Sequence, residues 1–342
     1  MKKQKYTHNK LFTFESGESI NSLELVYHIS SDFDPENRDC NKKVVWICHA
    51  LTANSDPTDW WVDLVGHGKL LDPKKYTIIC VNTLGSPYGS SGPSSIDNAT
   101  GSPYYFRFPE ITTRDIATTF SLVRKHLKID KIDLLIGCSV GGFHALEWSI
   151  METPVIEKAA YIACSYKVTP WFNSYNETMR MVIETDSSFR KAEDLSGGRE
   201  GLMCARAIGL ISYRSYEGYN LTQTERDTDF LFASNAGSYQ RYQGLKLANR
   251  FDAYSYYYLT KTADSGNVGR KRGGCEIALS KITAKSIVVG TDSDKLFPIE
   301  EQKFIEKYIP DCKFHLINSK FGHDGFLIEF EQLKEIIKSF FN

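Results

Sequence analysis

A glycine-rich segment contains the serine whose surroundings most favour chemistry. Residues 136–142 have the sequence IGCSVGG, which includes the pattern G-x-S-x-G around Ser139. An apolar run precedes it and a helical pattern follows it, as in a nucleophile elbow, a tight strand-to-helix turn that projects a serine above a sheet. The small residues Gly137 and Gly141 leave room for the turn, and the N-terminus of the next helix directs positive charge at the hydroxyl. The segment therefore predicts Ser139 as a nucleophile.

A serine hydroxyl needs a general base to react at neutral pH. In chains with this elbow the order is serine, then a carboxylate, then histidine. The histidines after Ser139 are His144, His315 and His323. His144 lies in the elbow helix, too close in sequence to reach back, and His315 lies inside an apolar strand pattern. His323, in a glycine-flanked loop before the C-terminal helix, is the predicted base.

The carboxylate that orients the base is expected after the preceding strand pattern. Asp292 and Asp294 both follow the apolar residues Val288 and Val289. Asp294 stands four residues before Pro298, the usual spacing in this loop, and is the residue we favour. The other interpretation assigns this role to Asp292, which otherwise caps the turn.

An acyl-transfer site also needs two backbone N–H groups to hold the oxyanion of the tetrahedral intermediate. One is expected from the residue after the nucleophile, Val140. The other is expected from Leu51, in the segment HALT that ends an earlier strand pattern. His49 precedes the nucleophile in the chain, which is the wrong order for the base, so we interpret it as a residue that stabilises this loop.

Two charged residues could hold a polar substrate. Residues 201–213 form a helical pattern that is apolar nearly all round, which predicts a buried helix, and it carries a single charge, Arg206. A buried guanidinium needs an anionic partner, either a structural carboxylate or the carboxylate of a substrate. Asp324, beside His323, either caps its loop or binds a substrate ammonium. Together the two residues would suit an amino acid.

The elements around these residues alternate between strands and helices. Short apolar runs at 44–48, 76–81, 132–138, 159–164, 286–289 and 313–317 predict strands buried on both faces. Residues 112–127 predict a helix, with a start signal at Thr112, and a second helix follows Gly142. Alternation at 23–29 predicts a half-buried strand, paired through a hairpin turn at 16–17 with residues 11–14. This order predicts an α/β fold with a mostly parallel sheet flanked by helices.

The alternation stops between about residues 166 and 279, where the pattern is mainly helical. We expect this stretch to be a cap inserted into one core that comprises residues 1–165 and 280–342, because the strands before and after it complete one sheet. A second domain with its own core is the alternative. The tyrosines at 254 and 256–258 suggest a homodimer contact in the cap, or else tyrosines that pack the cap or line a tunnel.

Composition excludes several classes of protein. The 342 residues carry a net charge of −1, from 41 Lys and Arg against 42 Asp and Glu, so we expect neither nucleic acid nor a membrane surface as partner. No apolar run is long enough to span a membrane, and because no apolar run follows the polar residues 1–10, we expect no signal peptide there. The eight cysteines, Cys40 among them, include no CxxC pair, so we expect no metal site and a reducing cytoplasm.

Several separate segments resemble the homoserine O-acetyltransferase family, whose members have the α/β-hydrolase fold with an inserted, mainly helical cap. The resemblance extends from about residue 11 to residue 341. The matching segments are HALT at 49–52, LGS at 84–86, GPSS at 92–95, RFP at 107–109, RD at 114–115, the elbow at 137–142, AR at 205–206, SYRS at 212–215, RYQG at 241–244, RFDA at 250–253, SD at 293–294 and GHDGF at 322–326.

The resemblance implies a ping-pong acyl transfer from acetyl-CoA, the co-substrate, to L-homoserine, with no bound cofactor. His323 would activate Ser139, and the acyl-enzyme would then react with the homoserine hydroxyl. Arg206 would bind the carboxylate of the amino acid and Asp324 its amino group. A cytoplasmic homodimer in methionine biosynthesis is expected on the same basis.

The sequence departs from the family pattern at Cys138 and Val140, where Gly and Met are usual, at Ala53 in place of Gly, and at Gly237 where Glu is common. We expect these changes to touch the acyl and acceptor pockets, which leaves succinyl transfer and serine as acceptor open. Two rival functions use the same fold. A capped serine esterase or thioesterase would use water as acceptor, and a non-catalytic binding protein would not need the intact set of Ser139, Asp294 and His323.

Overall fold

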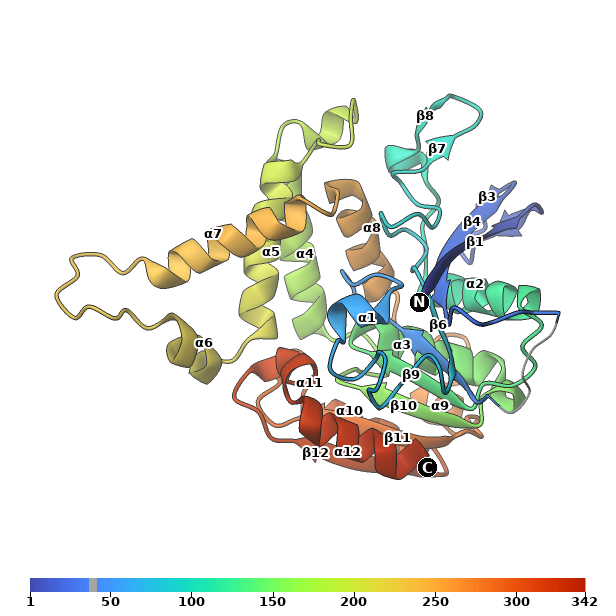
Figure 1. The fold of residues 1–342 in the computed structure, drawn as a ribbon. Coiled ribbons are helices and arrows are strands. Elements are labelled where there is room, and N and C mark those ends of the chain that lie inside the picture. The colour runs from blue at the N-terminus through green and yellow to red at the C-terminus, as the bar shows by residue number, and fades with distance from the viewer. Residues whose placement is uncertain (37–41, 342) are drawn as a thin grey trace.

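The computed structural model describes residues 1–36 and 42–341, so Cys40 lies outside the described residues. Eight strands form one sheet in the order β1-β4-β6-β5-β9-β10-β11-β12 (Figure 1). β4 pairs antiparallel with β1 and β6, and the pairs from β6 to β12 are parallel. The strands are β1 (Lys2–His8), β4 (Leu23–Ile29), β5 (Val44–Cys48), β6 (Thr77–Val81), β9 (Leu134–Cys138), β10 (Lys158–Ile162), β11 (Lys285–Thr291) and β12 (Cys312–Ile317).

The six apolar runs form six of these strands, which confirms the predicted parallel sheet. β5, β6 and β9 are buried along their whole length. β12 differs from the prediction, because only its last residue is buried. Its position explains the difference: β12 is the edge of the sheet, where one side of the backbone has no neighbouring strand.

The N-terminal pairing differs from the predicted hairpin. The turn at 16–17 joins the two-residue strands β2 (Phe12–Thr13) and β3 (Ser19–Ile20). β4 pairs instead with β1, which contains three lysines and forms the other edge of the large sheet. The sequence analysis found no strand in residues 2–8, because an edge strand with exposed polar side chains lacks the apolar run that marks a central strand.

Helices cover both faces of the sheet. Val44, Trp46 and Cys48 of β5 belong to one apolar cluster, and Val45 and Ile47 belong to the other, because successive side chains of a strand point to opposite faces. The first face is covered by α2 (Thr113–His126), α3 (Val140–Met151), α9 (Cys275–Leu279) and α10 (Ile299–Tyr308), and the second by α12 (Phe330–Phe341) and the segment after α1 (Pro57–Trp60). Short single-turn helices and the two-residue strands β7 (Ile96–Asp97) and β8 (Ser102–Pro103) lie in the connections.

The predicted helix at 112–127 is confirmed as α2. Thr112 caps it: its hydroxyl accepts a hydrogen bond from the Asp115 backbone N–H, and the Asp115 carboxylate accepts one from the Thr112 N–H. This reciprocal pair satisfies two backbone donors at the helix start. The elbow helix begins at Val140, three residues before the predicted start, because it follows Ser139 directly.

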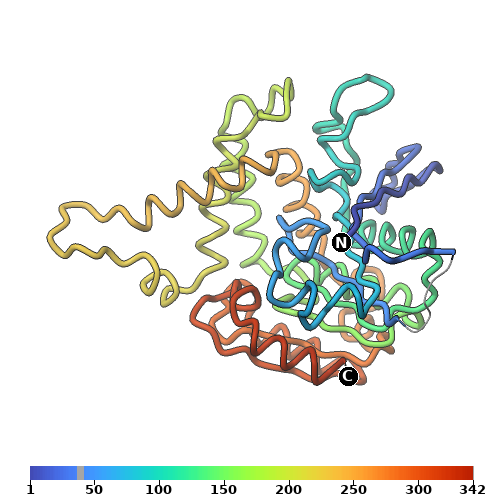
Figure 2. The backbone as a smooth tube through the Cα atoms, viewed as in Figure 1, coloured from blue at the N-terminus to red at the C-terminus, as the bar shows by residue number. Residues whose placement is uncertain are grey.

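The segment between β10 and β11 is helical, and the two strands it separates are parallel neighbours in the sheet. The helices are α4 (Pro170–Thr185), α5 (Arg199–Tyr213), α6 (Tyr216–Gln223), α7 (Asn235–Ala248) and α8 (Ala253–Asp264), before α9. α6, α7 and the loop between them project from the rest of the molecule as an arm (Figures 1 and 2). α4, α5, α7 and α8 enclose a separate apolar cluster that includes Met179, Leu202, Leu247 and Tyr254.

Two expectations for these helices are wrong. α5 is not buried all round, since Cys204 is exposed and Ile211 is 57% exposed. One side of α5 packs against α4 and α7, and the other side faces solvent. Tyr254, Tyr256 and Tyr258 are buried in α8, so they offer no contact surface and instead pack the helices together, as the alternative interpretation had it. In the described part of the chain, no helix has the length and apolar character needed to cross a membrane.

Candidate active site

Ser139 occupies a strained turn between β9 and α3. Its φ of 54° and ψ of −126° lie in a region that residues with a side chain rarely adopt. The neighbouring glycines make the turn possible. A Cβ atom on Gly141 would lie 2.1 Å from the carbonyl oxygen of Cys48, and one on Gly142 would lie 2.4 Å from Cys164 Cβ. The strand, turn and helix therefore meet as the G-x-S-x-G pattern predicted.

The three residues predicted for the proton relay lie within hydrogen-bond distance of one another. His323 Nε2 lies 2.8 Å from Ser139 Oγ, and His323 Nδ1 lies 2.8 Å from Asp294 Oδ2. The other oxygen of Asp294 accepts hydrogen bonds from the backbone N–H groups of Leu296 and Phe297, at 2.8 and 3.0 Å. Because these bonds fix the carboxylate, it can hold the imidazole with Nε2 facing the serine.

Asp292 is not part of this relay. Its side chain is exposed and accepts a hydrogen bond from the backbone N–H of Ser319 at 2.9 Å. This bond joins the ends of β11 and β12, so Asp292 has a structural role, although it differs from the turn cap considered for it. The structure therefore brings Asp294, and not Asp292, to His323.

Opposing effects set the pKa of His323. Burial lowers it, but the charge and hydrogen bond of Asp294, together with the charge of Asp324, raise it more, so the pKa lies above its usual value of 6.5. A base with a raised pKa accepts a proton more readily from a serine hydroxyl.

Leu51 and Val140, the predicted oxyanion donors, both line the pocket that contains Ser139. Val140 is the first residue of α3, so its N–H has no partner within the helix. His49 accepts a hydrogen bond from the Thr83 N–H at Nε2 (3.0 Å), which leaves Nδ1 to donate to the Ala50 carbonyl oxygen (2.8 Å). Burial lowers its pKa to about 4. His49 is therefore neutral and fixes the peptide that carries the Leu51 N–H, as predicted for a loop-stabilising residue.

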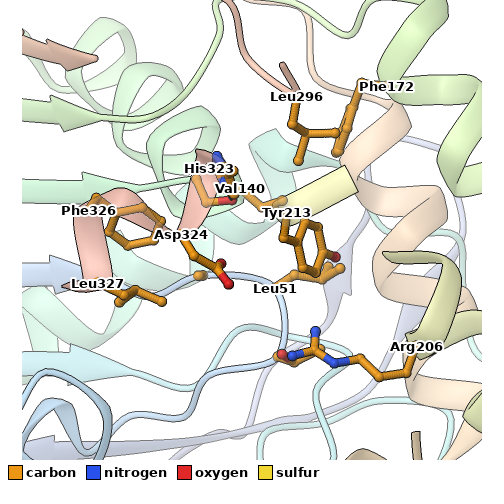
Figure 3. Close-up of a pocket in the computed structure, with 13 residues that line it drawn as sticks. Leu51, Val140, Phe172, Arg206, Tyr213, Leu296, His323, Asp324, Phe326 and Leu327 are labelled. Atoms are coloured by element: carbon orange, nitrogen blue, oxygen red, sulfur yellow. Dashed lines mark hydrogen bonds between the residues drawn. The ribbon is translucent and has the colours of Figure 1, made fainter. Parts of the chain in front are cut away.

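The pocket above Ser139 has apolar walls and a few charged groups (Figure 3). Its lining residues are Ala50, Leu51, Thr52, Ser139, Val140, Phe172, Arg206, Tyr213, Leu296, His323, Asp324, Phe326 and Leu327. The sequence analysis did not single out Phe172, Leu296 and Leu327, because apolar residues in a pocket and in a core have the same signature. Phe326 stood only as the last residue of the segment GHDGF. Tyr213 stood within the segment SYRS, but nothing in the sequence indicated that it faces the site.

Arg206 projects from α5 into the pocket, and its guanidinium lies 5.4 Å from the centre of the Tyr213 ring (Figure 3). Among residues 1–36 and 42–341, no carboxylate forms an ion pair with it and no acceptor forms a hydrogen bond with it. The described residues therefore supply no carboxylate partner that would give Arg206 a purely structural role. A half-buried guanidinium in a pocket can bind a planar anion.

Asp324 also lines the pocket, and it has a partner that the sequence analysis missed. Its Oδ2 lies 3.0 Å from Nε of Arg214, the residue that follows α5. Burial raises the pKa of Asp324, while the charges of Arg214, His323 and Arg206 oppose this effect. The only sequence signal for Arg214 was its place in SYRS, one residue after Tyr213.

Other candidates lie away from the relay. Cys138 is buried with its thiol 3.7 Å from the Cys48 carbonyl oxygen, and burial raises its pKa to about 12, so its packing role is confirmed. His144 is buried and its pKa is lowered to about 3 by burial and by the charge of His49. Gly237 lies on α7 with open space around it and does not line the pocket, contrary to expectation. The described residues hold no group of three or more His, Cys, Asp or Glu side chains suited to a metal ion.

Comparison with known proteins identifies the family. Residues 43–330 match the family model described as alpha/beta hydrolase fold. The homoserine O-acetyltransferase of Cyclobacterium marinum is 45% identical over 331 residues, which cover 96% of this chain and 92% of that protein. The chain belongs to the homoserine O-acetyltransferase family. The corresponding enzyme of Chlorobium chlorochromatii is 34% identical, with 98% of this chain and 94% of that protein covered.

Solved structures of this family and of hydrolases share the fold. A homoserine O-acetyltransferase from Staphylococcus aureus superposes with a TM-score of 0.81 at 28% identity, covering 100% of this chain and 96% of that one. Esterase E22 superposes with a TM-score of 0.88 at 21% identity, with both chains covered completely. Because an esterase and an acetyltransferase have the same architecture, the fold does not distinguish them, and the pocket must do so.

Proposed function

We propose that this member of the homoserine O-acetyltransferase family transfers the acetyl group of acetyl-CoA to the hydroxyl of L-homoserine, in methionine biosynthesis. One observation carries the proposal. Ser139, His323 and Asp294 have relay geometry, and the pocket lined by Ser139 and His323 is also lined by Arg206 and Asp324. The relay supplies the acyl-transfer chemistry, and the two charges match the carboxylate and ammonium of an amino acid.

In the first half-reaction, His323 Nε2 accepts the proton of Ser139 Oγ as this oxygen attacks the thioester carbonyl. The N–H groups of Leu51 and Val140 stabilise the oxyanion, and Asp294 stabilises the imidazolium. The C–S bond then breaks, and His323 returns the proton to the departing CoA thiolate. The product is an acetyl ester on Ser139.

In the second half-reaction, homoserine enters the space that CoA has left. Arg206 binds its carboxylate and Asp324 binds its ammonium, which directs the hydroxyl towards the ester. His323 accepts the hydroxyl proton as the oxygen attacks, the same N–H groups hold the second oxyanion, and Ser139 departs with the proton from His323.

A hydrolase is the second candidate, because esterase E22 has the same fold. In a hydrolase, water would attack the acyl-enzyme, and Arg206 and Asp324 would have no role. Serine as acceptor and succinyl-CoA as donor are variants of the main proposal, since the pocket walls include Val140 where the family usually has methionine.

Release of free CoA thiol tests these alternatives. The assay combines acetyl-CoA or succinyl-CoA with L-homoserine, L-serine or water alone, for the wild type and for Ser139→Ala. The proposal expects fast release from acetyl-CoA only with homoserine, and loss of this release in the variant. Equal release with water alone contradicts a transferase. A preference for serine or succinyl-CoA would revise the substrate and retain the mechanism.

We further propose that residues 166–279 act as a cap on a core formed by residues 1–165 and 280–342, with α9 as the returning connection. The cap supplies Phe172, Arg206 and Tyr213 to the pocket, and the core supplies Ser139 and His323. Free, buried cysteines such as Cys48 and Cys164 support a cytoplasmic location.

A homodimer contact is proposed on the arm formed by α6, α7 and their connecting loop, in place of the buried tyrosines of α8. Large apolar side chains are exposed along this arm: Tyr216 (86%), Leu221 (63%), Leu231 (86%), Phe232 (82%) and Tyr242 (59%). Exposed apolar side chains gathered on one projecting element favour burial against a protein surface. The partner proposed for this surface is a second copy of this chain.

A further inference from the structure

The end of α5 packs directly on the loop that carries His323 and Asp324. Gly322 has a φ of 69°, and a Cβ atom there would lie 2.8 Å from the carbonyl carbon of Arg214 and 2.8 Å from the backbone nitrogen of Ser215. Ser215 Oγ donates a hydrogen bond to the carbonyl oxygen of Lys320. Two backbones in such close contact cannot shift independently. The position of Arg214 is therefore fixed relative to Asp324.

The Arg214 side chain is held between Asp324 and the arm. Its Nε lies 3.0 Å from Asp324 Oδ2, a contact between opposite charges without hydrogen-bond geometry, and its Nη2 donates to the Tyr239 hydroxyl of α7 at 3.5 Å. The side chains of Arg214 and Asp324 are 25% and 17% exposed, so the pair is largely shielded from water. An ion pair in this setting is screened much less than one on the surface.

Asp324 needs a cation near it to remain charged. Burial raises its pKa, and the nearby Asp294 raises it further. The charges that oppose this are, in order, those of Arg214, His323 and Arg206. Arg206 faces the pocket without a carboxylate partner, and His323 exchanges its proton during catalysis. Arg214 is thus the cation that pairs with Asp324 throughout the reaction.

We propose that Arg214 is a positioning residue of the acceptor site, which keeps Asp324 charged and oriented to receive the ammonium of L-homoserine. The inference rests on the proposed function. Arg214 pairs with Oδ2, which leaves Oδ1 of Asp324 for the ammonium. Arg206, eight residues earlier and inside α5, would face the carboxylate of the same substrate, whereas Arg214 directly follows this helix. One helix therefore organises both charges of the acceptor site.

The two half-reactions separate this role from a general structural one. Acetylation of Ser139 by acetyl-CoA requires the relay and the oxyanion donors, and it involves no amino acid. The charge of Asp324 also raises the pKa of His323, but at a pH well above that pKa His323 is neutral in either case, and only the second half-reaction depends on Asp324. Loss of the Arg214 charge should therefore impair the use of homoserine and leave acetylation of the enzyme intact.

The experiment compares Arg214→Gln, Arg214→Lys and the control Lys320→Gln. Lys320 of the core pairs with Glu217 of the cap close to Arg214, but both side chains are more than 60% exposed. We expect Arg214→Gln to raise the KM for L-homoserine roughly tenfold to a hundredfold, since one partner of a shielded ion pair is lost. At a pH well above the pKa of His323, the rate of CoA release in a single turnover without homoserine should change less than about twofold. Arg214→Lys should restore part of the KM, and Lys320→Gln should match the wild type.

A pH series and a double-mutant cycle complete the test. In Arg214→Gln the pKa of Asp324 should rise, so the KM for homoserine should become larger as the pH falls, more steeply than in the wild type. In an Asp324→Asn background, Arg214→Gln should add little. A homoserine KM unchanged in Arg214→Gln, or an equal loss of enzyme acetylation, would overturn the inference. Failure of the wild type to acetylate homoserine would instead reject the proposed function itself.

Discussion

At the scale of single residues, the candidate site depends on which atom each polar group can reach. Asp292 and Asp294 are two residues apart, yet one bonds the backbone of Ser319 and the other bonds His323. Spacing from Pro298 was enough to favour Asp294. The partner of Asp324 could not be predicted, because Arg214 lies more than a hundred positions earlier in the sequence and reaches it only through the packing of α5 on the histidine loop.

The two aspartates give a paired prediction. Asp294→Asn should lower kcat by roughly 10⁴-fold, because an amide favours the wrong tautomer of His323, as found for the equivalent change in a serine protease. Asp292→Asn should stay within a fewfold of the wild type, since Asp292 only joins two loops. Steady-state CoA release measures both variants. A large loss in Asp292→Asn with little loss in Asp294→Asn would reverse the assignment.

The raised pKa of His323 predicts the pH dependence of enzyme acetylation. His323 must be neutral to accept the serine proton, so the rate should fall as the pH drops through a pKa above 6.5. Asp324 contributes to this raised pKa, so Asp324→Asn should move the acidic limb to lower pH. The measurement is kcat/KM for acetyl-CoA against pH in both proteins. An acidic limb that moves upwards in the variant would contradict the electrostatic account.

At the scale of elements, the spacing of apolar residues and the residues that start or end helices and turns predicted the central strands, the start of α2 and the elbow. Buried strands and capped helices follow local rules, so their signals are contained in short segments. The pairing of β1 with β4 and the exposed side of α5 depend on which neighbours an element meets. The sequence analysis missed the β1–β4 pairing and the exposed side of α5, because both depend on which neighbouring elements cover the strand or helix.

The elbow should be intolerant of even one additional carbon atom. Gly141→Ala should destabilise the fold by roughly 1–3 kcal/mol, because the new Cβ would lie 2.1 Å from the Cys48 carbonyl oxygen. Gly237→Ala is the matched control: it lies within α7 with nothing within 4 Å, and should stabilise the protein by about 1 kcal/mol. Urea denaturation followed by circular dichroism compares them. Equal urea midpoints for Gly141→Ala and the wild type would contradict the prediction, because the elbow backbone would then have shifted to accommodate the added Cβ atom.

At the scale of the whole molecule, the site lies between the sheet and the helices that the chain inserts between β10 and β11. Ser139 and His323 come from loops at the carboxyl ends of β9 and β12, whereas Arg206 and Tyr213 come from α5. The mostly parallel sheet could be predicted from the alternation of its elements. The arm, which Figure 2 shows projecting from the molecule, could not. Helices α6 and α7 are polar enough in sequence to resemble ordinary surface helices, and the exposure of their apolar residues depends on where the helices lie.

The arm predicts the oligomeric state. The wild type should have the mass of a dimer by light scattering, and the double variant Leu231→Asp, Phe232→Asp should have that of a monomer, because charges would replace two exposed apolar side chains at the tip of the arm. Val62→Asp, at a half-exposed apolar residue on the core, should remain dimeric. A monomeric wild type would refute the contact.

The adjacency of β10 and β11 also has a consequence for biosynthesis. A ribosome makes β10 first, and it must then make every helix from α4 to α9 before β11 emerges to pair with it. Throughout that interval the nascent sheet presents an unpaired parallel edge at Lys158–Ile162, which contains mostly buried apolar side chains. Such edges invite association with other chains until they are covered. Chaperone engagement should therefore be concentrated in the window of translation between these two strands.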